Sequence, residues 1–406
     1  MDPKRRVLFI SDLTPAGGGG AVSAWMLQAL AADYEVVILT WRKPDFPAVD
    51  RLFATSLAGL SFEILRPGPL ERWMIERIPD DSNMQCANYL LRTAKRIAGD
   101  FDAVIACSDF ESDLGFPGIQ YVHYPYLARL WKVLTVQGDA PWPAGIRALI
   151  RGRVRPWMII SGYSFERMRA NLHLTNSHWT RNEIRRLFDM GSTVVYPPAP
   201  GDYRPVDWDQ RENGFIAIGR FHTMKRFDWI VETIAEVRKQ EPSIRLHLCG
   251  TQDSPGILER LQALAREHGP WIEIHRELSS RDLTALACRQ RYGIHAMVDE
   301  HFGIAPAQMA RAGCIPFVPN SGGQVEIVDS DPRLCFSTRE EAVAKILAVM
   351  SARTAQDDLH SSVQHRSHRF SCEAFSQNIR THVRDFISRR KSVPALSRDH
   401  ESVLLP

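Results

Sequence analysis

Residues 292–328 read YGIHAMVDEHFGIAPAQMARAGCIPFVPNSGGQVEIV. Short apolar runs alternate here with polar and glycine-rich breaks, which is typical of buried strands and helices that follow one another. The stretch predicts, in order, a strand, an acidic loop, a helix, a second strand, a glycine turn and a helix start, at 292–297, 299–303, 305–312, 314–318, 321–323 and 325–328. Such a unit belongs to an open α/β sheet, which binds ligands at the carboxyl ends of its strands.

The loops of this unit carry the first candidate site residues. Free backbone N–H groups from Phe302 to Ile304 would point at an anion, and the dipole of the following helix would add to the attraction. Glu300 on the loop and Gln308 on the helix are eight residues apart, so both can border one cleft. The alternative is that both are solvated surface residues.

A second glycine-rich turn follows the first predicted strand, 6–13. Four glycines, 17–20, stand before a helix predicted over 21–32. Such a turn lets the backbone approach a phosphate closely. The turn lacks both the Gly-x-Gly-x-x-Gly dinucleotide pattern and the Gly-Lys-Ser/Thr of a P-loop. A flexible surface loop is the alternative interpretation.

Three charged or titratable side chains also follow predicted strands. His123 comes directly after the strand predicted over 118–122, where a ligand can be met. Arg220 and Lys225 flank the loop after the strand at 215–218, and two cations so placed can grip a diphosphate. The ordinary alternatives are a packed core histidine and solvated surface charges.

The length and charge of the chain restrict the class of protein. At 406 residues the chain exceeds one ordinary domain. A Pro/Gly run at 197–201 predicts the boundary, with domains over 1–200 and 201–370, a helix over 371–390 and a disordered tail over 391–406. A net charge of +3 argues against a nucleic-acid binder.

The cysteines and the apolar runs indicate in which cellular compartment the protein is expected. Seven cysteines are scattered without a Cys-x-x-Cys pair, which predicts a reduced, cytoplasmic setting without a disulfide framework or a zinc site. The apolar run 7–13 is too short for a signal peptide and contains Asp12. No apolar run approaches 18 residues, so we expect no membrane-spanning segment.

Taken together, these motifs resemble those of retaining, nucleotide-sugar-dependent glycosyltransferases of family 4, which have the GT-B fold. The resemblance rests on the glycine turn at 17–20, His123, the loop at 219–225, the sequence EHFG at 300–303 and GGQVEIV at 322–328. Segments 121–125, 175–180 and 194–198 look more narrowly like mannosyltransferases that extend lipid-linked oligosaccharides. The implied architecture is α/β, with two Rossmann-like doubly wound domains facing across a cleft and a C-terminal helix returning to the N-terminal domain.

The resemblance also implies roles for the candidate residues. Arg220 and Lys225 would neutralise the donor diphosphate, without a metal or another cofactor. Glu300 would hold hydroxyl groups of the transferred sugar, and His123 would lie beside the reaction centre. The remaining donor-binding residues would be Gly18, Gly19, Gly20, Gly219, Phe302, Gly303, Ile304 and Gln308.

One residue departs from the family pattern, which has a second Glu where this chain has Gln308. A Gln keeps one carbonyl acceptor but loses the charge and gains an NH₂ donor. We expect weaker or altered nucleoside binding from this change. The alternatives to a transferase are a sugar-nucleotide epimerase and a non-catalytic nucleotide-sugar sensor.

The substrates and partners follow from the resemblance alone. It favours GDP-mannose as donor, with a UDP-sugar as the alternative, and a glycan or lipid-linked glycan as acceptor. Two basic and aromatic segments, 72–74 and 151–158, would suit contact with an anionic membrane surface, on which the protein would be peripheral. Ordinary helix packing explains these segments equally well.

Overall fold

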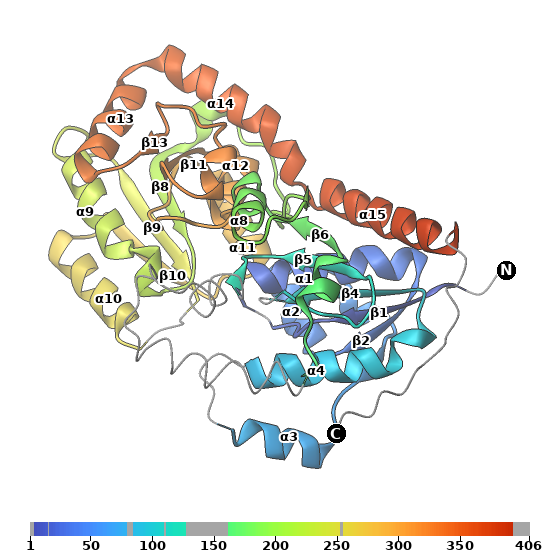
Figure 1. Ribbon diagram of the computed structural model, residues 1–406. Coiled ribbons are helices and arrows are strands. Elements are labelled where there is room, and N and C mark those ends of the chain that lie inside the picture. Colours follow the sequence, from blue (N-terminus) through green and yellow to red (C-terminus); the bar gives the residue numbers. More distant parts are fainter. Residues whose placement is uncertain are drawn as a thin grey trace, which may run out of the picture.

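The computed structural model describes residues 4–14, 16–78, 84–108, 111–126, 161–251 and 255–392. Two α/β bodies lie side by side, and each is built on one parallel sheet with helices packed on its faces (Figure 1). The predicted fold class, two doubly wound domains, is confirmed.

The first body contains a seven-stranded sheet in the order β3-β2-β1-β4-β5-β6-β7. Its strands are β1 Arg6–Ile10, β2 Glu35–Leu39, β3 Glu63–Leu65, β4 Ala103–Ser108, β5 Ile119–Val122, β6 Leu172–Thr175 and β7 Thr193–Val194. Its helices are α1 Gly17–Asp33, α2 Phe46–Phe53, α3 Pro69–Glu76, α4 Met84–Ile97, α7 Phe165–Arg169 and α8 His178–Phe188. Because β1 has β2 on one side and β4 on the other, the strand order reverses there, and such a switch point is where ligands bind.

The second body repeats this plan with six strands in the order β10-β9-β8-β11-β12-β13. They are β8 Glu212–Ile218, β9 Arg245–Gly250, β10 Ile272–Arg276, β11 Gln290–Ile294, β12 Ile315–Pro319 and β13 Cys335–Phe336. The α-helices that follow β8 are α9 Phe227–Arg238, α10 Ile257–His268, α11 Ser280–Cys288, α12 Ile304–Arg311, α13 Arg339–Ser351, α14 Arg353–Ser367 and α15 Cys372–Ser392. The switch point lies between β8 and β11.

Residues 292–328 fold largely as predicted. It forms β11, α12 and β12, and both strands are buried because a central strand of a parallel sheet is covered on both faces. The predicted helix start at 325–328 is wrong, since only a short 3₁₀ helix, Gly323–Glu326, forms there. Asp329 and Ser330 adopt left-handed φ angles of 57° and 56°, which prevents the turn from continuing as an α-helix.

The last helix joins the two bodies. In Figure 1, α15 leaves the second body and lies along the first. Its buried apolar side chains recur every fourth residue and enter the core of the first sheet, at Phe375, Ile379, Val383 and Ile387. This spacing puts them on one face of the helix, where they pack against the first body. The predicted return of the C-terminal helix is therefore confirmed.

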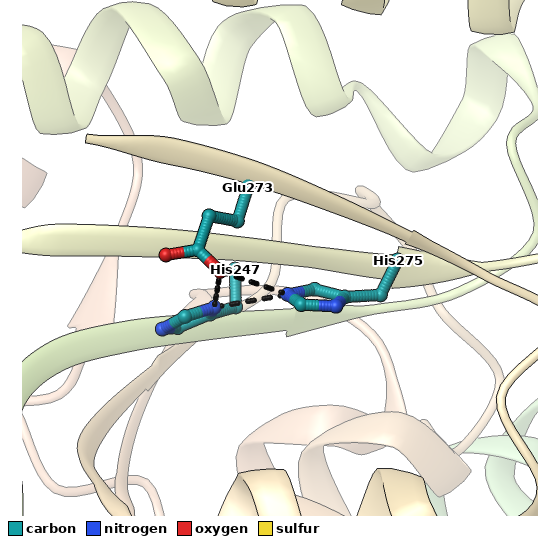
Figure 2. A group of neighbouring side chains, drawn as sticks. All are labelled: His247, Glu273 and His275. Atoms are coloured by element: carbon teal, nitrogen blue, oxygen red, sulfur yellow. Dashed lines mark hydrogen bonds and ion pairs between the residues drawn. The ribbon is translucent and has the colours of Figure 1, made fainter. Parts of the chain in front are cut away.

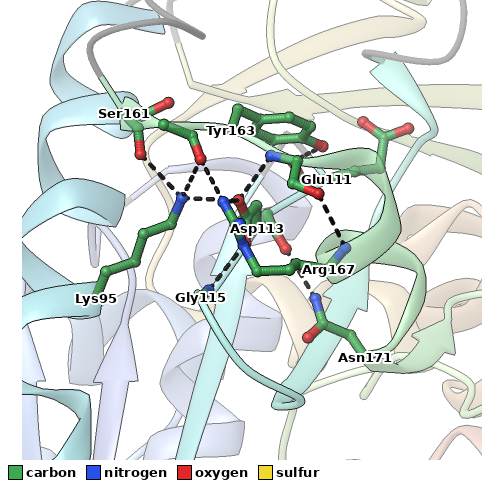
Figure 3. Close-up of polar contacts among 11 residues, drawn as sticks. Lys95, Glu111, Asp113, Gly115, Ser161, Tyr163, Arg167 and Asn171 are labelled. Carbon is green, nitrogen blue, oxygen red and sulfur yellow. Dashed lines mark hydrogen bonds and ion pairs between the residues drawn. The ribbon is translucent and has the colours of Figure 1, made fainter. Parts of the chain in front are cut away.

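A buried ionic cluster ties together segments of the first body (Figure 3). The Asp113 carboxylate is fully buried and binds Lys95 of α4 at 2.7 Å and Arg167 of α7 at 2.8 Å. It also accepts the backbone N–H groups of Gly115 at 2.9 Å and Ser164 at 2.7 Å. Burial on its own would raise the pKa of Asp113, but these partners outweigh it and lower the pKa.

The structure bears on the predicted absence of disulfides and of membrane-spanning segments. All seven cysteines are free and buried. Within the described residues, no helix is both long and apolar enough to cross a bilayer. The predicted disordered tail, apart from its first two residues in α15, and the basic segment at 151–158 lie outside the described residues.

Candidate active site

A cavity of about 470 Å³ opens between the two bodies, at the carboxyl ends of strands from both sheets. Its walls contain eleven of the twelve predicted site residues: Gly18, Gly19, His123, Gly219, Arg220, Lys225, Glu300, Phe302, Gly303, Ile304 and Gln308. Gly20 does not line the cavity, because it faces Thr14 O and the ring of Phe53 inside the first body. Residues separated by up to 290 positions, Gly18 and Gln308, thus meet in one place.

The glycine run is the first turn of α1 rather than a separate loop. It faces the second body closely: a Cβ added to Gly18 would lie 3.1 Å from Ile304 Cδ1, and one added to Gly17 would lie 3.8 Å from Arg220 Nε. A larger side chain at position 18 would therefore push the two bodies apart or displace Ile304. The turn brings backbone N–H groups of α1 towards Arg220 and the start of α12.

Lys225 and Glu300 form an ion pair across the cavity wall, and both side chains are largely buried. His295, at the end of β11, lies 3.3 Å from the same carboxylate oxygen through its Nε2. Burial on its own would raise the pKa of Glu300, but the Lys225 ammonium and His295 outweigh it and hold the pKa well below its ordinary value. The carboxyl group is therefore ionised at neutral pH.

Two features add positive potential on the side of the second body. Arg220 is exposed in the cavity wall, two residues after the end of β8. The N-terminus of α12 opens onto the same space at Ile304. The residue before it, Gly303, has φ of 98°, and a Cβ there would come within 3.3 Å of Pro306 and Gln324, so this turn requires glycine. The cavity can therefore attract an anion without any other group.

His123 faces these groups from the first body. It follows β5, and its backbone carbonyl accepts a hydrogen bond from the Asn176 side chain at 2.8 Å. Its Nε2 lies 3.5 Å from the Cys107 thiol, which in turn accepts a hydrogen bond from Ser23 at 3.2 Å. The ring is thus held both through its backbone and through one nitrogen, which is suitable for contact with a ligand.

Gln308 lies on α12 and makes a hydrogen bond through its side-chain NH₂, a group that a Glu does not have. Its side-chain NH₂ donates to the backbone carbonyl of Pro200 over 3.1 Å, in the connection between the two bodies. The hydroxyl group of Tyr203 donates to the same carbonyl at 3.0 Å. The difference from the family pattern is therefore accommodated by a specific hydrogen bond.

Contacts between the bodies involve residues that the sequence did not single out. The Glu326 carboxylate accepts the backbone N–H groups of His178 at 3.0 Å and Trp179 at 2.9 Å, so it caps α8 of the first body. The nearly parallel rings of His301, Tyr124 and Trp179 form a cluster, with centroids 4.2 Å apart for His301 and Tyr124, 5.7 Å for His301 and Trp179, and 6.2 Å for Tyr124 and Trp179. These contacts close one side of the cavity.

Other cavity residues were also missed by the sequence analysis. Asn176 lies in segment 175–180, which was noted only for its resemblance to mannosyltransferases. The others follow strand ends whose loops carry no recognisable motif: Thr251, Glu277 and Ser280. The available signal was their position, since Thr251 and Glu277 come directly after β9 and β10. Gly323 marks a close approach: a Cβ there would lie 2.2 Å from His301 O and 2.9 Å from Ser177 Cβ.

This arrangement suits the departure of an anionic leaving group. Two cations and a helix N-terminus lie in one part of the cavity, while a carboxylate and an imidazole are available to bind hydroxyl groups. Fixed positive groups in a partly dry site stabilise charge that develops during bond cleavage.

Comparison with known proteins finds glycosyltransferases similar to this chain. Residues 203–366 match the family model described as Glycosyl transferases group 1. A GDP-Man:Man(3)GlcNAc(2)-PP-Dol alpha-1,2-mannosyltransferase of Dictyostelium discoideum is 27% identical over 245 residues, which are 54% of this chain and 48% of that protein. The human protein of the same name is 26% identical over 51% of this chain and 46% of its own length. The chain thus spans about half the length of these relatives.

Solved structures agree over almost the whole chain. Sucrose-phosphate synthase from Thermosynechococcus elongatus has a TM-score of 0.66 at 16% identity and covers 95% of this chain and 100% of its own. Anabaena HepE in complex with UDP and glucose has a TM-score of 0.64 at 12% identity, with 94% and 100% covered. The resemblance found in the sequence is confirmed: the protein has the GT-B fold, and residues 203–366 match the group 1 glycosyltransferase family model.

Proposed function

We propose that this protein is a retaining glycosyltransferase that moves a hexose from a nucleotide sugar to a hydroxyl group of a glycan or lipid-linked glycan. Mannose from GDP-mannose is the favoured donor, because the relatives named above are GDP-mannose-dependent. A UDP-sugar is the alternative. The observation that carries the proposal is the meeting of Arg220, Lys225, Glu300 and His123 in one cavity between the two bodies.

The cations of the second body take up the charge of the leaving group. When the bond between the sugar and the phosphate breaks, the electron pair stays on the phosphate oxygen. Arg220, Lys225 and the N-terminus of α12 stabilise this oxygen and the diphosphate behind it, so transfer needs no metal ion.

Lys225 can serve the donor without leaving Glu300. An ammonium group has three N–H donors, and the ion pair with Glu300 uses one of them. The other two N–H donors of Lys225 can bind phosphate oxygens of the donor. Glu300, kept ionised by Lys225 and His295, accepts hydrogen bonds from the hydroxyl groups of the sugar.

Retention follows from departure and attack on the same face of the sugar. The acceptor hydroxyl approaches the anomeric carbon from the side that the phosphate leaves, and its proton passes to the departing phosphate oxygen. A new carbon–oxygen bond replaces the one that breaks, so the configuration is preserved. His123 contacts the sugar from the first body and orients it for this attack.

A product assay tests the proposal directly. The full chain is incubated with radiolabelled GDP-mannose, or with labelled UDP-sugars, and a membrane lipid extract. Labelled glycolipid supports transfer, whereas a new nucleotide sugar or free sugar indicates an epimerase. Donor binding without any product indicates a sensor, and that result would refute the proposed activity.

The proposal includes a peripheral position on the inner face of a membrane. Three apolar side chains of α3, Leu70, Trp73 and Met74, are exposed, Leu70 by 67% and Trp73 by 55%. Arg77 lies over the Trp73 ring at 3.6 Å, so a basic group accompanies the apolar ones. In Figure 1, α3 lies at the edge of the first body, away from its sheet. Trp and Arg together suit an anionic membrane surface.

Vesicle flotation tests this position. Wild type should float with vesicles that contain phosphatidylserine, and a Leu70→Ser, Trp73→Ser double variant should remain in the unbound fraction. Neutral phosphatidylcholine vesicles are the control. Equal flotation of the two proteins would show that α3 is not the contact.

A further inference from the structure

Three potential metal ligands meet on two adjacent strands of the second body, outside the cavity. His247 is on β9, and Glu273 and His275 are on β10. The strands are parallel and Glu273 lies opposite His247, while Glu273 and His275 are two residues apart and so share a face. Figure 2 shows the three side chains pointing toward one another. Their ligand atoms all lie within 4.8 Å of one another.

We propose that His247, Glu273 and His275 bind one transition-metal ion of the Zn²⁺ type. His247 Nδ1 lies 3.0 Å from His275 Nε2, and each nitrogen lies 3.7 Å from Glu273 Oε2. Zinc binds such atoms at about 2.0–2.2 Å, so two ligand atoms up to about 4.2 Å apart can contact the same ion. Two imidazoles and one carboxylate favour Zn²⁺ or a similar ion over Mg²⁺ and Ca²⁺.

The surroundings of the three residues are those of a prepared ligand set. The second carboxylate oxygen of Glu273, Oε1, is held by Arg245 at 3.1 Å, which leaves Oε2 directed at the imidazoles. The second ring nitrogen of His247, Nε2, lies 3.8 Å from a carboxylate oxygen of Glu212. Carboxylates near a metal site commonly orient its histidines, and at 3.8 Å the contact with Glu212 is electrostatic rather than a hydrogen bond.

A hydrogen bond between His247 and His275 without a metal ion accounts for fewer of these contacts than a bound ion does. Two neutral rings can share one proton across 3.0 Å. That bond would leave Glu273 too far from either ring for a hydrogen bond. The two nearest cations are engaged by carboxylates, Arg245 by Glu273 and Arg289 by Glu212 at 3.6 Å.

The site's position suggests a structural role next to the donor cavity. Both strands run directly into cavity loops, since Thr251 follows β9 and Glu277 follows β10. An ion bound to both strands would cross-link them at the edge of the sheet and hold these loops in place. Glu273 and His275 are partly exposed, so an ion and a water ligand can reach the site from solvent.

Metal titration of the full chain tests this site without any donor or acceptor. After treatment with chelator, the protein is titrated with Zn²⁺ by calorimetry and with Co²⁺ by visible absorption. We expect one equivalent to bind. At a free Zn²⁺ concentration of 100 times Kd, the melting temperature should rise by about 5–10 °C. Failure of Zn²⁺ to bind, or equal stabilisation by Mg²⁺, would overturn the proposal.

Three variants locate the ion. His275→Gln and Glu273→Gln change partly exposed residues of an edge strand and should abolish both the calorimetric signal and the stabilisation by Zn²⁺. His365→Gln, at an exposed position of α14, is the matched control and should bind Zn²⁺ as wild type does. Unchanged binding by His275→Gln, or a Co²⁺ spectrum with thiolate absorption, would contradict the assignment. These readouts do not depend on transferase activity, so their failure and that of the proposed function are distinguishable.

Discussion

The side-chain amide of Gln308 donates a hydrogen bond to the backbone carbonyl of Pro200, with 3.1 Å between the two atoms. Gln308 belongs to α12 of the second body, whereas Pro200 is buried in the connection between the bodies. A carboxylate has no N–H group to donate. The residue at position 308 therefore links one wall of the cavity to the chain that joins the two domains.

Gln308→Glu should weaken the fold while improving nucleoside binding. A carboxylate would face the Pro200 carbonyl oxygen, so the free energy of unfolding should fall by about 1–3 kcal/mol. If a nucleoside binds beside residue 308, its hydroxyl groups would gain a charged acceptor, and such hydrogen bonds are about twice as strong as neutral ones. Urea denaturation and calorimetry with nucleoside diphosphates measure the two effects. Gln308→Met is the control, since it loses the hydrogen bond without adding charge.

Removing either cation of the cavity should reduce turnover. One well-placed electrostatic group contributes roughly 10²–10³ in rate, so Arg220→Ala and Lys225→Ala should each lower kcat by about this factor. Steady-state kinetics with labelled donor provides the measurement. Arg204→Ala is a suitable control because its exposed pair with Asp202 lies outside the cavity wall. Unchanged turnover in both cavity variants would remove the assignment of the diphosphate site.

The site residues that the sequence predicted share their position in loops that follow buried strands. Glu300, Lys225 and the start of α12 lie in or at the end of the loops that follow buried strands, and the carboxyl ends of parallel strands meet at one edge of a sheet. Hydrophobic runs locate such strands without knowledge of the tertiary structure. The same reasoning brought His123 to the cavity from the other body.

Other features depended on information that no local pattern contains. Glu326 caps α8 across 148 residues, and this contact exists only because the two bodies pack in one orientation. Helix α14 was missed because it is largely polar and buries few apolar residues, chiefly Leu359 and Val363. The ligand set of His247, Glu273 and His275 depends on the register between β9 and β10, which the sequence does not reveal.

The Glu300 ion pair should make stability depend on acidic pH. The folded protein holds the pKa of Glu300 below its ordinary value of 4.5, so the unfolded chain binds a proton more readily. The stabilisation is therefore complete above about pH 4.5 and is lost as pH falls below that value. Urea denaturation at pH 7, 5, 4 and 3 should give a difference between wild type and Glu300→Gln that shrinks toward low pH. A constant difference would mean that the carboxylate charge does not stabilise the fold.

Truncating Glu326 should loosen the contact between the bodies. Glu326→Ala removes the acceptor for two backbone N–H groups of α8, and hydrogen bonds to charged groups are worth about 1.5–3 kcal/mol each. The free energy of unfolding should fall by about 3–6 kcal/mol for the two bonds together, and hydrogen exchange should speed up at His178 and Trp179. Glu326→Gln retains one acceptor oxygen and should lose less. Unchanged exchange at both amides would indicate that closure does not depend on this cap.

Asp113 should be among the most sensitive positions of the first body. Asp113→Asn leaves the largely buried Lys95 ammonium beside a neutral amide, whereas the half-exposed Arg167 can turn to solvent, and breaking a buried ion pair costs about 3–5 kcal/mol. Glu183→Gln is the matched control, because its pair with Arg186 lies on the surface and should be worth at most about 1 kcal/mol. Urea denaturation compares the two variants. The loss expected for Asp113→Asn arises because a buried charge loses its partner and water cannot replace that partner. Equal losses in the two variants would mean that the network in Figure 3 orders its segments without stabilising the fold.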